Sequence, residues 1–165
     1  MNVKRLIKHF ALPPWLLRRA LTSSTMHAIE AAIAASETRH LGQIRFAVEE
    51  SLAFDALWRG KTGRERALEV FANLRVWDTE LNNGVLVYLL LADRDVEIVA
   101  DRGIYRAVGE AAWEEICRSI EAALQAGQFE TGVVKGVEAI GAQLAVHYPR
   151  HAAGANELPD VPVVL

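Results

Sequence analysis

The sequence predicts an α/β fold, a three-layer α/β/α sandwich built on a small mixed sheet. Helical and strand-like patterns follow one another in the order helix, strand, helix, strand, strand, helix, helix. Residues 85–91 form a continuous apolar run, which is typical of a strand buried on both faces at the centre of a sheet. Helices are therefore expected on both sides of that sheet.

The first half of the chain provides a helix, a strand and a second helix. Thr22, Ser23 and Ser24 each offer an oxygen to cap the first helix, whose apolar residues recur at helical spacing as far as about residue 39. Residues 44–48 alternate between apolar and other side chains, which indicates a half-buried strand. Thr62 can cap the second helix, which is expected to end near Trp77.

A turn and a hairpin surround the central apolar run. Asn82-Asn83-Gly84 predicts the turn, because Asn and Gly tolerate positive φ. Residues 92–95 form a tight polar turn and residues 96–100 resume the alternation, which indicates a hairpin. A strand, a crossover helix and a strand form a parallel right-handed unit, so the sheet combines this parallel unit with an antiparallel hairpin strand.

Two further helices are expected to close the domain. The first carries an apolar stripe over residues 112–124 and ends at Gly127, and Thr131 can cap the second. Three glycines lower the intrinsic stability of the second helix by about 1 kcal/mol each relative to alanine. We expect a close approach to the sheet to compensate for them. They are Gly132, Gly136 and Gly141.

Composition limits the class of protein. The 165 residues are 52% apolar and 24% charged, which is typical of one globular domain. The net charge of −3 gives no argument for binding nucleic acid, and no apolar run reaches the roughly 18 residues that a membrane span needs. The single cysteine, Cys117, excludes a disulfide framework. We expect a cytoplasmic protein with no transmembrane segment and no nucleic-acid partner.

Charge divides the chain into three expected parts. Residues 1–21 form a basic amphipathic arm, residues 22–150 the α/β domain, and residues 151–165 a proline-containing tail. Two interpretations of the arm stay open. Its leucines and Trp15 pack on the domain, or the arm contacts a protein partner or an anionic membrane surface, which would place the protein at the periphery of a membrane.

The predicted topology brings polar loops to one end of the sheet. The chain enters both parallel strands at that end and leaves the third strand there, so His40, residues 78–84 and residues 101–103 are expected to meet. Their oxygen atoms suit a hard cation such as Ca²⁺ or Mg²⁺. The candidate metal ligands are Asp78, Asn82, Asn83 and Asp101.

Other residues of these loops have different expected roles. Arg102 can hold a phosphate or carboxylate through paired N–H donors, and Gly84 and Gly103 are expected to shape the loops. A plain structural explanation stays open, in which Asp78 belongs to a helix C-terminal turn and Asp101 forms a surface ion pair with Arg102. The opposite end of the sheet ranks second as a site. It gathers Glu49, Glu50, Asp55, Asp93, Arg94 and Asp95.

Several motifs, in this order along the chain, resemble those of the TPM domain family. They are residues 44–48, the helix ending in Trp77, residues 82–87, residues 93–99 and residues 101–104. The family takes its name from a thylakoid lumen protein, a photosystem II repair protein and a modulator of acetylcholine receptors. The resemblance covers roughly residues 24–148, implies the sandwich described above, and is closest to short cytoplasmic-type bacterial members.

The resemblance also implies what the site residues do. Acid phosphatase activity is attributed to a plant member and divalent-cation binding to some bacterial members. Matched residue by residue, the family supports Asn82, Asn83, Asp101 and Gly103, with Asp78 and Arg102 as neighbours. Many members have an export signal and a C-terminal membrane anchor, which this sequence is expected to lack. Their glycine-tyrosine-glycine element is replaced here by residues 101–103.

Two functions stay open. The favoured one is a non-catalytic module that binds a cation or a protein partner, in some settings close to a membrane, because no general base or nucleophile is identifiable from the pattern. The alternative is a divalent-cation-dependent, phosphatase-like hydrolase. In it, Asp78, Asn82 and Asp101 hold the cation, and Arg102 stabilises the developing charge.

Overall fold

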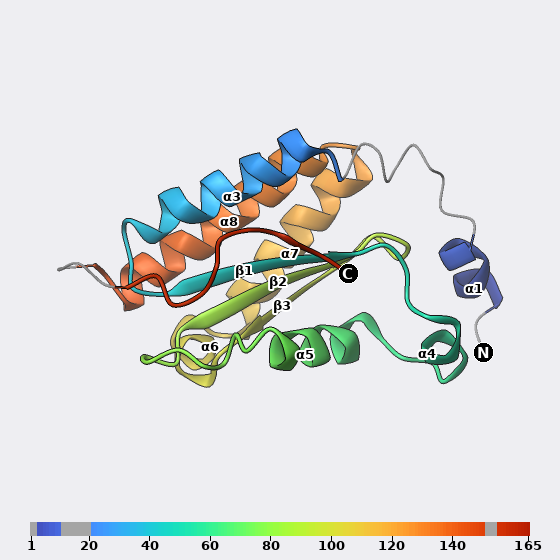
Figure 1. Ribbon diagram of the computed structural model, residues 1–165, viewed down its shortest axis with the longest axis horizontal. Coiled ribbons are helices and arrows are strands. Elements are labelled where there is room, and N and C mark those ends of the chain that lie inside the picture. The colour runs from blue at the N-terminus through green and yellow to red at the C-terminus, as the bar shows by residue number, and fades with distance from the viewer. Residues whose placement is uncertain (1–2, 11–20, 151–154) are drawn as a thin grey trace.

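The computed structural model describes residues 3–10, 21–150 and 155–165, which form a four-stranded mixed sheet with helices on both faces (Figure 1). The strand order is β3-β2-β1-β4, with β1 parallel to β2 and β4, and with β2 antiparallel to β3. The predicted α/β sandwich is confirmed. The strands are β1 (Gln43–Glu49), β2 (Gly84–Leu90), β3 (Asp95–Ala100) and β4 (Val163–Val164).

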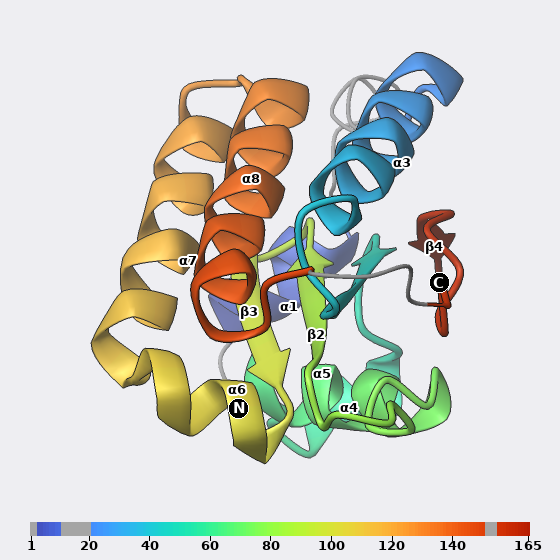
Figure 2. The same cartoon turned by 90° about the vertical axis from the view of Figure 1, so that its left-hand side faces the viewer.

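Helices α3, α7 and α8 cover one face of the sheet, and α5 covers the other (Figures 1 and 2). Helix α1 lies beside the turn that joins β2 to β3. The helices are α1 (Val3–Phe10), α3 (Ser23–Glu37), α4 (Phe54–Trp58), α5 (Gly63–Asn73), α6 (Arg102–Val108), α7 (Glu110–Gln125) and α8 (Phe129–His147).

Strand β2 is buried along its whole length, as the apolar run predicted. Alternate side chains of a strand point to opposite faces, so β2 contributes to two hydrophobic cores. Val85, Val87 and Leu89 pack in the core beneath α3, α7 and α8. Leu86 and Tyr88 pack in the core that α5 closes.

The predicted helix caps are partly confirmed. The Thr22 hydroxyl oxygen accepts the N–H of Thr25, and Thr62 forms a full capping box with Glu65 at the start of α5. The predicted cap at Thr131 is wrong, because α8 begins at Phe129 and Thr131 lies inside it.

Helix α5 ends earlier than predicted. Its last residue is Asn73 rather than one near Trp77. Arg75 adopts a φ of +53°, a left-handed conformation that cannot continue the helix. The chain from Leu74 to Trp77 therefore turns away before β2.

The glycines of α8 allow helices, not the sheet, to approach closely. A Cβ atom at Gly132 would lie 2.5 Å from the Cβ atom of Ala123 in α7. A Cβ atom at Gly141 would lie 1.8 Å from the Ser36 hydroxyl oxygen in α3. The expectation of a close approach to the sheet is wrong, since α8 packs between two helices at these positions.

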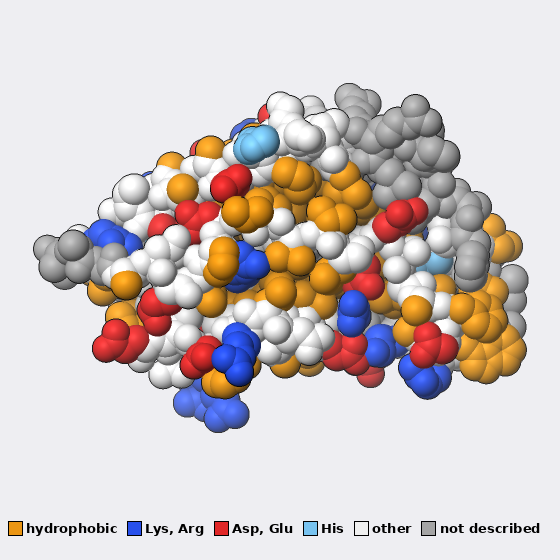
Figure 3. Space-filling model, viewed as in Figure 1, with side chains coloured by type: hydrophobic (Ala, Val, Ile, Leu, Met, Phe, Trp, Pro, Cys, Tyr) orange, Lys and Arg blue, Asp and Glu red, His pale blue; other side chains and the backbone are white. Residues whose placement is uncertain are grey.

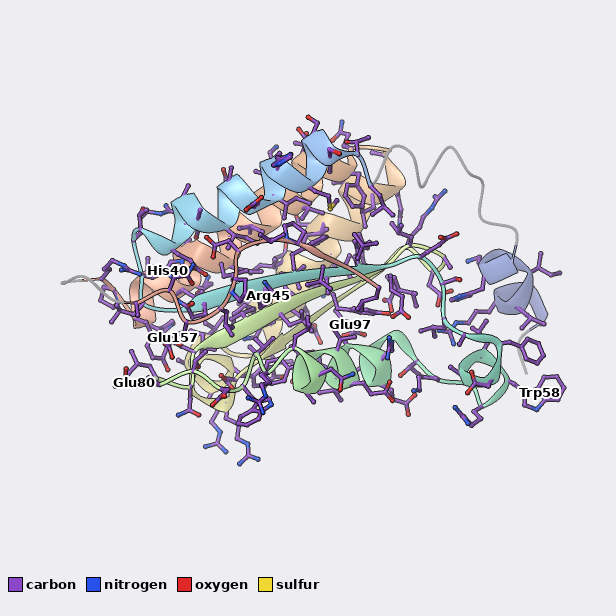
Figure 4. The ribbon with its side chains drawn as sticks, in the orientation of Figure 1. His40, Arg45, Trp58, Glu80, Glu97 and Glu157 are labelled. Atoms are coloured by element: carbon purple, nitrogen blue, oxygen red, sulfur yellow. The ribbon has the colours of Figure 1, made fainter. Side chains whose placement is uncertain are left out.

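The C-terminal segment lies along the free edge of β1. Leu165 donates its N–H to the carbonyl oxygen of Val48 at 2.9 Å, next to the short parallel strand β4. Beneath this segment, the buried guanidinium of Arg45 donates from Nη1 to the carbonyl oxygens of Pro159 and Val161 (Figure 4). The segment therefore covers an edge that would otherwise be exposed for pairing.

The described part of the N-terminal arm packs on the domain. Arg5 donates from Nε to Oδ2 of Asp93 at 2.8 Å, and His9 accepts the N–H of Leu52 at Nδ1 over 3.1 Å. Trp15 lies outside the described residues. Among the helices of the described residues, none combines the length and apolar character that crossing a membrane requires.

We predict that Arg45→Met releases the C-terminal segment without unfolding the domain. Methionine fills the buried volume but cannot donate to the two tail carbonyls. Amide exchange at Val164 and Leu165 should accelerate by about tenfold or more, while exchange in β2 stays unchanged.

The matched control is Arg59→Met, which removes an exposed arginine that pairs with Asp55 on the same surface. Hydrogen exchange followed by NMR makes the measurement. Equal protection of Leu165 in the Arg45→Met variant and the wild type would contradict the proposed anchoring.

Candidate functional site

The predicted site lies at the end of the sheet where β1 and β2 begin and β3 ends. Gln43 pairs with Gly84 across the parallel strands, and Val85 pairs with Ala100 across the hairpin. Directly after β3, Asp101 donates its N–H to the carbonyl oxygen of Gly84 at 2.9 Å. The structure therefore brings residues from both sides of β2 together at one end.

Asp101 has a buried carboxylate that neutral groups contact. Its Oδ2 accepts the backbone N–H of Gly84 at 3.1 Å and the hydroxyl of Thr79 at 3.2 Å. Burial raises the pKa of this carboxyl, although the two hydrogen bonds lower it. No described cationic side chain forms an ion pair with it, so its negative charge is poorly compensated.

Asn83 is fully buried beside this carboxylate. Its Nδ2 donates to the carbonyl oxygen of Leu41 at 3.1 Å, while its backbone N–H donates to the Thr79 hydroxyl oxygen at 3.1 Å. Its Oδ1 has no hydrogen-bond partner among the described residues. A buried acceptor without a partner costs about 1–3 kcal/mol, so this oxygen is poised for a donor or a cation.

Thr79 joins the two residues and was not singled out from the sequence. One hydroxyl accepts from the Asn83 N–H and donates to Asp101, which fixes the distance between the β2 turn and the end of β3. The sequence does contain a local signal for the contact between Thr79 and Asn83, since Thr hydroxyls often bind backbone N–H groups a few residues away. Its contact with Asp101, however, depends on the fold.

The other predicted site residues differ in their placement. Asn82 is exposed and adopts a φ of +52°, and a Cβ atom at Gly103 would lie 2.8 Å from its carbonyl oxygen. A Cβ atom at Gly84 would lie 2.0 Å from a backbone oxygen, so no side chain fits there. Asp78 and Arg102 are exposed, and among the described residues neither forms a hydrogen bond or ion pair with Asp101.

The arrangement limits which cation it could hold. Across the described ranges, no three His, Cys, Asp or Glu side chains converge closely enough for a metal ion. A cation beside Asp101 would therefore depend on amide and carbonyl oxygens in addition to this one buried carboxylate. Ca²⁺ accepts such mixed oxygen ligands and irregular geometry more readily than Mg²⁺ does.

His40 lies near these loops but is held in a structural role. Its Nδ1 is within 3.0 Å of the carbonyl oxygen of Gly42, which requires the proton on Nδ1, and its Nε2 is within 3.0 Å of the Ser36 hydroxyl. Burial lowers its pKa to about 4. Both ring nitrogens are thus occupied while the imidazole is neutral.

Glu37 is a buried carboxyl on the opposite side of β1 from Asn83. Its Oε1 accepts the N–H of Ile44 at 2.8 Å. Burial raises its pKa to about 7; the nearby charge of Asp160 also raises it, while the Ile44 hydrogen bond and Arg150 lower it.

The C-terminal segment reaches the candidate site. Glu157 accepts the N–H of Glu80 at 2.9 Å through Oε2, and its own N–H donates to Oε1 of Gln43 at 2.7 Å. Figure 4 shows Glu80, Glu157 and His40 at the same end of the molecule. This contact was not predicted, because nothing in the composition of the tail indicates where it docks.

At the opposite end of the sheet, ranked second from the sequence, the carboxylates of Glu49 and Asp93 have arginine partners. Glu49 forms an ion pair with Arg66 at 2.8 Å and accepts the hydroxyl of Tyr88 at 2.7 Å. Asp93 forms an ion pair with Arg5 at 2.8 Å, and Nε2 of His9 lies 3.2 Å from its Oδ2. These neighbours compensate the negative charge, which leaves less reason for a cation to bind there.

Comparisons with known proteins show which family and which solved structures the chain is similar to. A model of the TPM domain family matches residues 18–143. The NMR structure of the BA42 protein from the psychrophilic bacterium Bizionia argentinensis is 32% identical, with a TM-score of 0.76, and the match covers 87% of this chain and 94% of that one. A comparison with curated proteins gave no match.

Two more distant structures share the fold. The N-terminal domain of a Porphyromonas gingivalis protein is 16% identical with a TM-score of 0.63, covering 81% of this chain and 83% of that one. The N-terminal domain of the cg2496 protein of Corynebacterium glutamicum is 15% identical with a TM-score of 0.56, covering 82% and 78%.

We predict that Glu37→Gln stabilises the protein at high pH. The raised pKa means that the folded chain holds this proton more tightly than the unfolded chain does between pH 4.5 and about 7. The residue's contribution to the free energy of unfolding is therefore full below pH 4.5 and lost as the pH rises through 7. Glutamine keeps an oxygen for the Ile44 N–H and cannot ionise.

Urea unfolding at pH 5 and pH 8 tests this prediction. The variant should gain roughly 1–3 kcal/mol over the wild type at pH 8 and clearly less at pH 5. Glu30→Gln, on the same helix, serves as the control. A gain of the same size at both pH values would show that ionisation of Glu37 is not the cause.

Proposed function

The chain belongs to the TPM domain family, and we propose that it is a non-catalytic module that binds a divalent cation where β1 and β2 begin. The observation that supports this most is the unpaired Oδ1 of the fully buried Asn83. The buried Asp101 carboxylate, which no described cationic side chain compensates, supplies negative charge at the same end of the sheet, where it accepts the N–H of Gly84, the residue after Asn83.

The proposed ligands come from two loops. Asn83 offers its amide oxygen and Asp101 its carboxylate, while the exposed Asn82 offers an amide oxygen from the turn. Asp78 would complete the site from the surface. Because half of these ligands are neutral amide oxygens in irregular loops, we propose Ca²⁺ as the preferred ion and Mg²⁺ as a weaker one.

Arg102 could bind an anionic group on a partner that also contacts the cation. Its exposed guanidinium follows Asp101 directly at the start of α6. A bidentate N–H fork suits a carboxylate or phosphate on a partner, which would share the bound cation. A hydrolase would also need a group to activate water, and His40 is unsuited to this because both of its nitrogens are engaged.

We predict that Ca²⁺ shifts the backbone NMR signals around Asn83 and Asp101, and that Asp101→Asn weakens this binding by about tenfold or more. The variant keeps an oxygen for the Gly84 N–H but loses the charge. Asn82→Asp should tighten binding, because it adds a carboxylate at a φ that aspartate tolerates. Asp55→Asn, at the far end of the molecule, should leave the affinity unchanged.

Two outcomes of this titration would contradict the proposal. The first is the absence of shifts at Asn83 and Asp101 in 10 mM CaCl₂, on the order of ten times the weakest dissociation constants of calcium modules. The second is cation-dependent hydrolysis of p-nitrophenyl phosphate that Asp101→Asn and Asp78→Asn both abolish. That result would favour the hydrolase instead.

A second proposal concerns membrane contact, which an apolar surface at the other end of the molecule supports. Ile7 on α1 and Trp58 on α4 are 60% and 59% exposed, and Phe54 packs against Trp58 with ring centroids 5.8 Å apart. Figure 3 shows apolar side chains gathered at this end. With the exposed Lys8, this surface has the chemistry of a peripheral contact with anionic lipid.

We predict that vesicles of equal parts phosphatidylglycerol and phosphatidylcholine pellet the protein, and that Trp58→Ser reduces the pelleted fraction several-fold. Trp77→Ser removes a tryptophan of similar exposure elsewhere and should have little effect. Negligible pelleting of the wild type at low salt, or equal loss in both variants, would contradict a membrane contact at this surface.

A further inference from the structure

A cavity of about 330 Å³ lies along the free edge of β3, and it shares no residue with the candidate cation site. Helix α7 forms one wall, with Trp113 and Cys117 among its residues. Arg64 of α5, Tyr105 of α6 and Glu97 of β3 also line the cavity. The volume suits a small organic molecule.

The lining has an excess of negative charge. Five carboxylates and two guanidinium groups surround the space. Arg64 forms an ion pair with Glu97 at 3.3 Å, whereas Arg118 pairs with glutamates of its own helix. The carboxylates are those of Asp95, Glu97, Glu110, Glu114 and Glu121.

Three of these five carboxylates lack a cationic partner. Within the described parts of the chain, no ion pair is formed by Asp95, Glu110 or Glu121. Burial raises the pKa of Asp95 and of Glu97, and repulsion by Glu121 raises both further. A positive group placed in the cavity would relieve this repulsion.

Trp113 provides an independent indication of a ligand. Its side chain is among those lining the cavity, and the residue is only 3% exposed. Its Nε1–H has no acceptor among the described residues. A buried indole N–H normally finds a partner, so we take this unpaired donor, on a residue that lines the cavity, as a sign that a ligand binds there.

The backbone groups at the edge of β3 already have side-chain partners, so an added strand cannot pair there. A small molecule is therefore the better candidate for the cavity. Glu121 accepts the N–H of Val96 at 3.3 Å, and Arg64 donates to the carbonyl oxygen of Ile98 at 2.6 Å. These side chains occupy the backbone groups that a pairing strand would need. A metal ion is also unsuited, since no three ligating side chains converge among the described residues.

We propose that this cavity binds a small zwitterion with a basic end, the chemistry of a basic amino acid. The ammonium or guanidinium group would lie against Asp95, Glu97 and Glu121. The carboxylate at the other end would accept the Nε1–H of Trp113 and face Arg118. The aromatic surfaces of Trp113 and Tyr105 favour a cation in the same space.

NMR titration of the whole chain with L-arginine tests the proposal. We expect the indole Nε1–H signal of Trp113 and the β3 amide signals to shift and saturate. Glu97→Gln and Glu121→Gln should each weaken binding by about fivefold or more. Glutamine at position 121 keeps an acceptor for the Val96 N–H, so the edge of β3 stays intact.

Three controls make the outcome decisive. Glu138→Gln removes an exposed carboxylate on α8 and should leave the affinity unchanged. Succinate has no cationic group and should not bind. Spermidine has charge but no carboxylate, and it should bind more weakly than arginine without shifting the Trp113 indole signal.

The proposal is wrong if 10 mM arginine leaves the Trp113 and β3 signals unmoved. It is also wrong if Glu97→Gln and Glu138→Gln bind arginine equally, or if spermidine binds as tightly as arginine. Each of these readings is independent of calcium, so failure here says nothing about the site at Asn83 and Asp101.

Discussion

Water reaches neither face of strand β2, and the position of every functional candidate depends on that burial. Its seven residues are buried, with alternate side chains in two separate cores. Its hydrogen-bonding edges are likewise occupied, by β1 on one side and by β3 on the other. Because the first pairing is parallel and the second antiparallel, the loop before β2 and the residue after β3 must meet at one end. The contact between Gly84 and Asp101 follows directly from this pairing.

The carboxylates at the two ends of the sheet have different kinds of hydrogen-bond and ion-pair partners. At the end where β1 and β2 finish, Glu49 and Asp93 are paired with arginines. At the other end, among the described residues, Asp101 receives only neutral donors and Asn83 has an oxygen without a partner. A neutral donor stabilises a carboxylate by hydrogen bonding without cancelling its charge, so the field of Asp101 persists. For this reason we propose cation binding at the end where the buried Asp101 carboxylate has no arginine partner among the described residues.

Local patterns were enough to predict the central fold, and they failed where contacts are distant in sequence. The apolar run of β2 and the caps at Thr22 and Thr62 depend on residues within one element, and they were identified correctly. The glycines of α8 were recognised as a weakness, but their helical neighbours were not, because packing partners cannot be read from one helix. Strand β4 was missed for the same reason, since two residues gain β structure only from the edge of β1.

The same distinction applies to the candidate site. Asn83 and Asp101 were selected because chain reversal brings strand ends together, which topology alone predicts. Thr79 was not selected, because its hydroxyl matters only through the Asp101 contact made across the hairpin. No local sequence pattern indicates a role for Glu157. Its side chain nevertheless accepts the N–H of Glu80, in the loop between Thr79 and Asn83. The geometry of the Asn83 loop is therefore linked to the docking of the C-terminal segment. Any ligand that orders this loop must favour the docked segment by the same free energy that the segment contributes to the ligand.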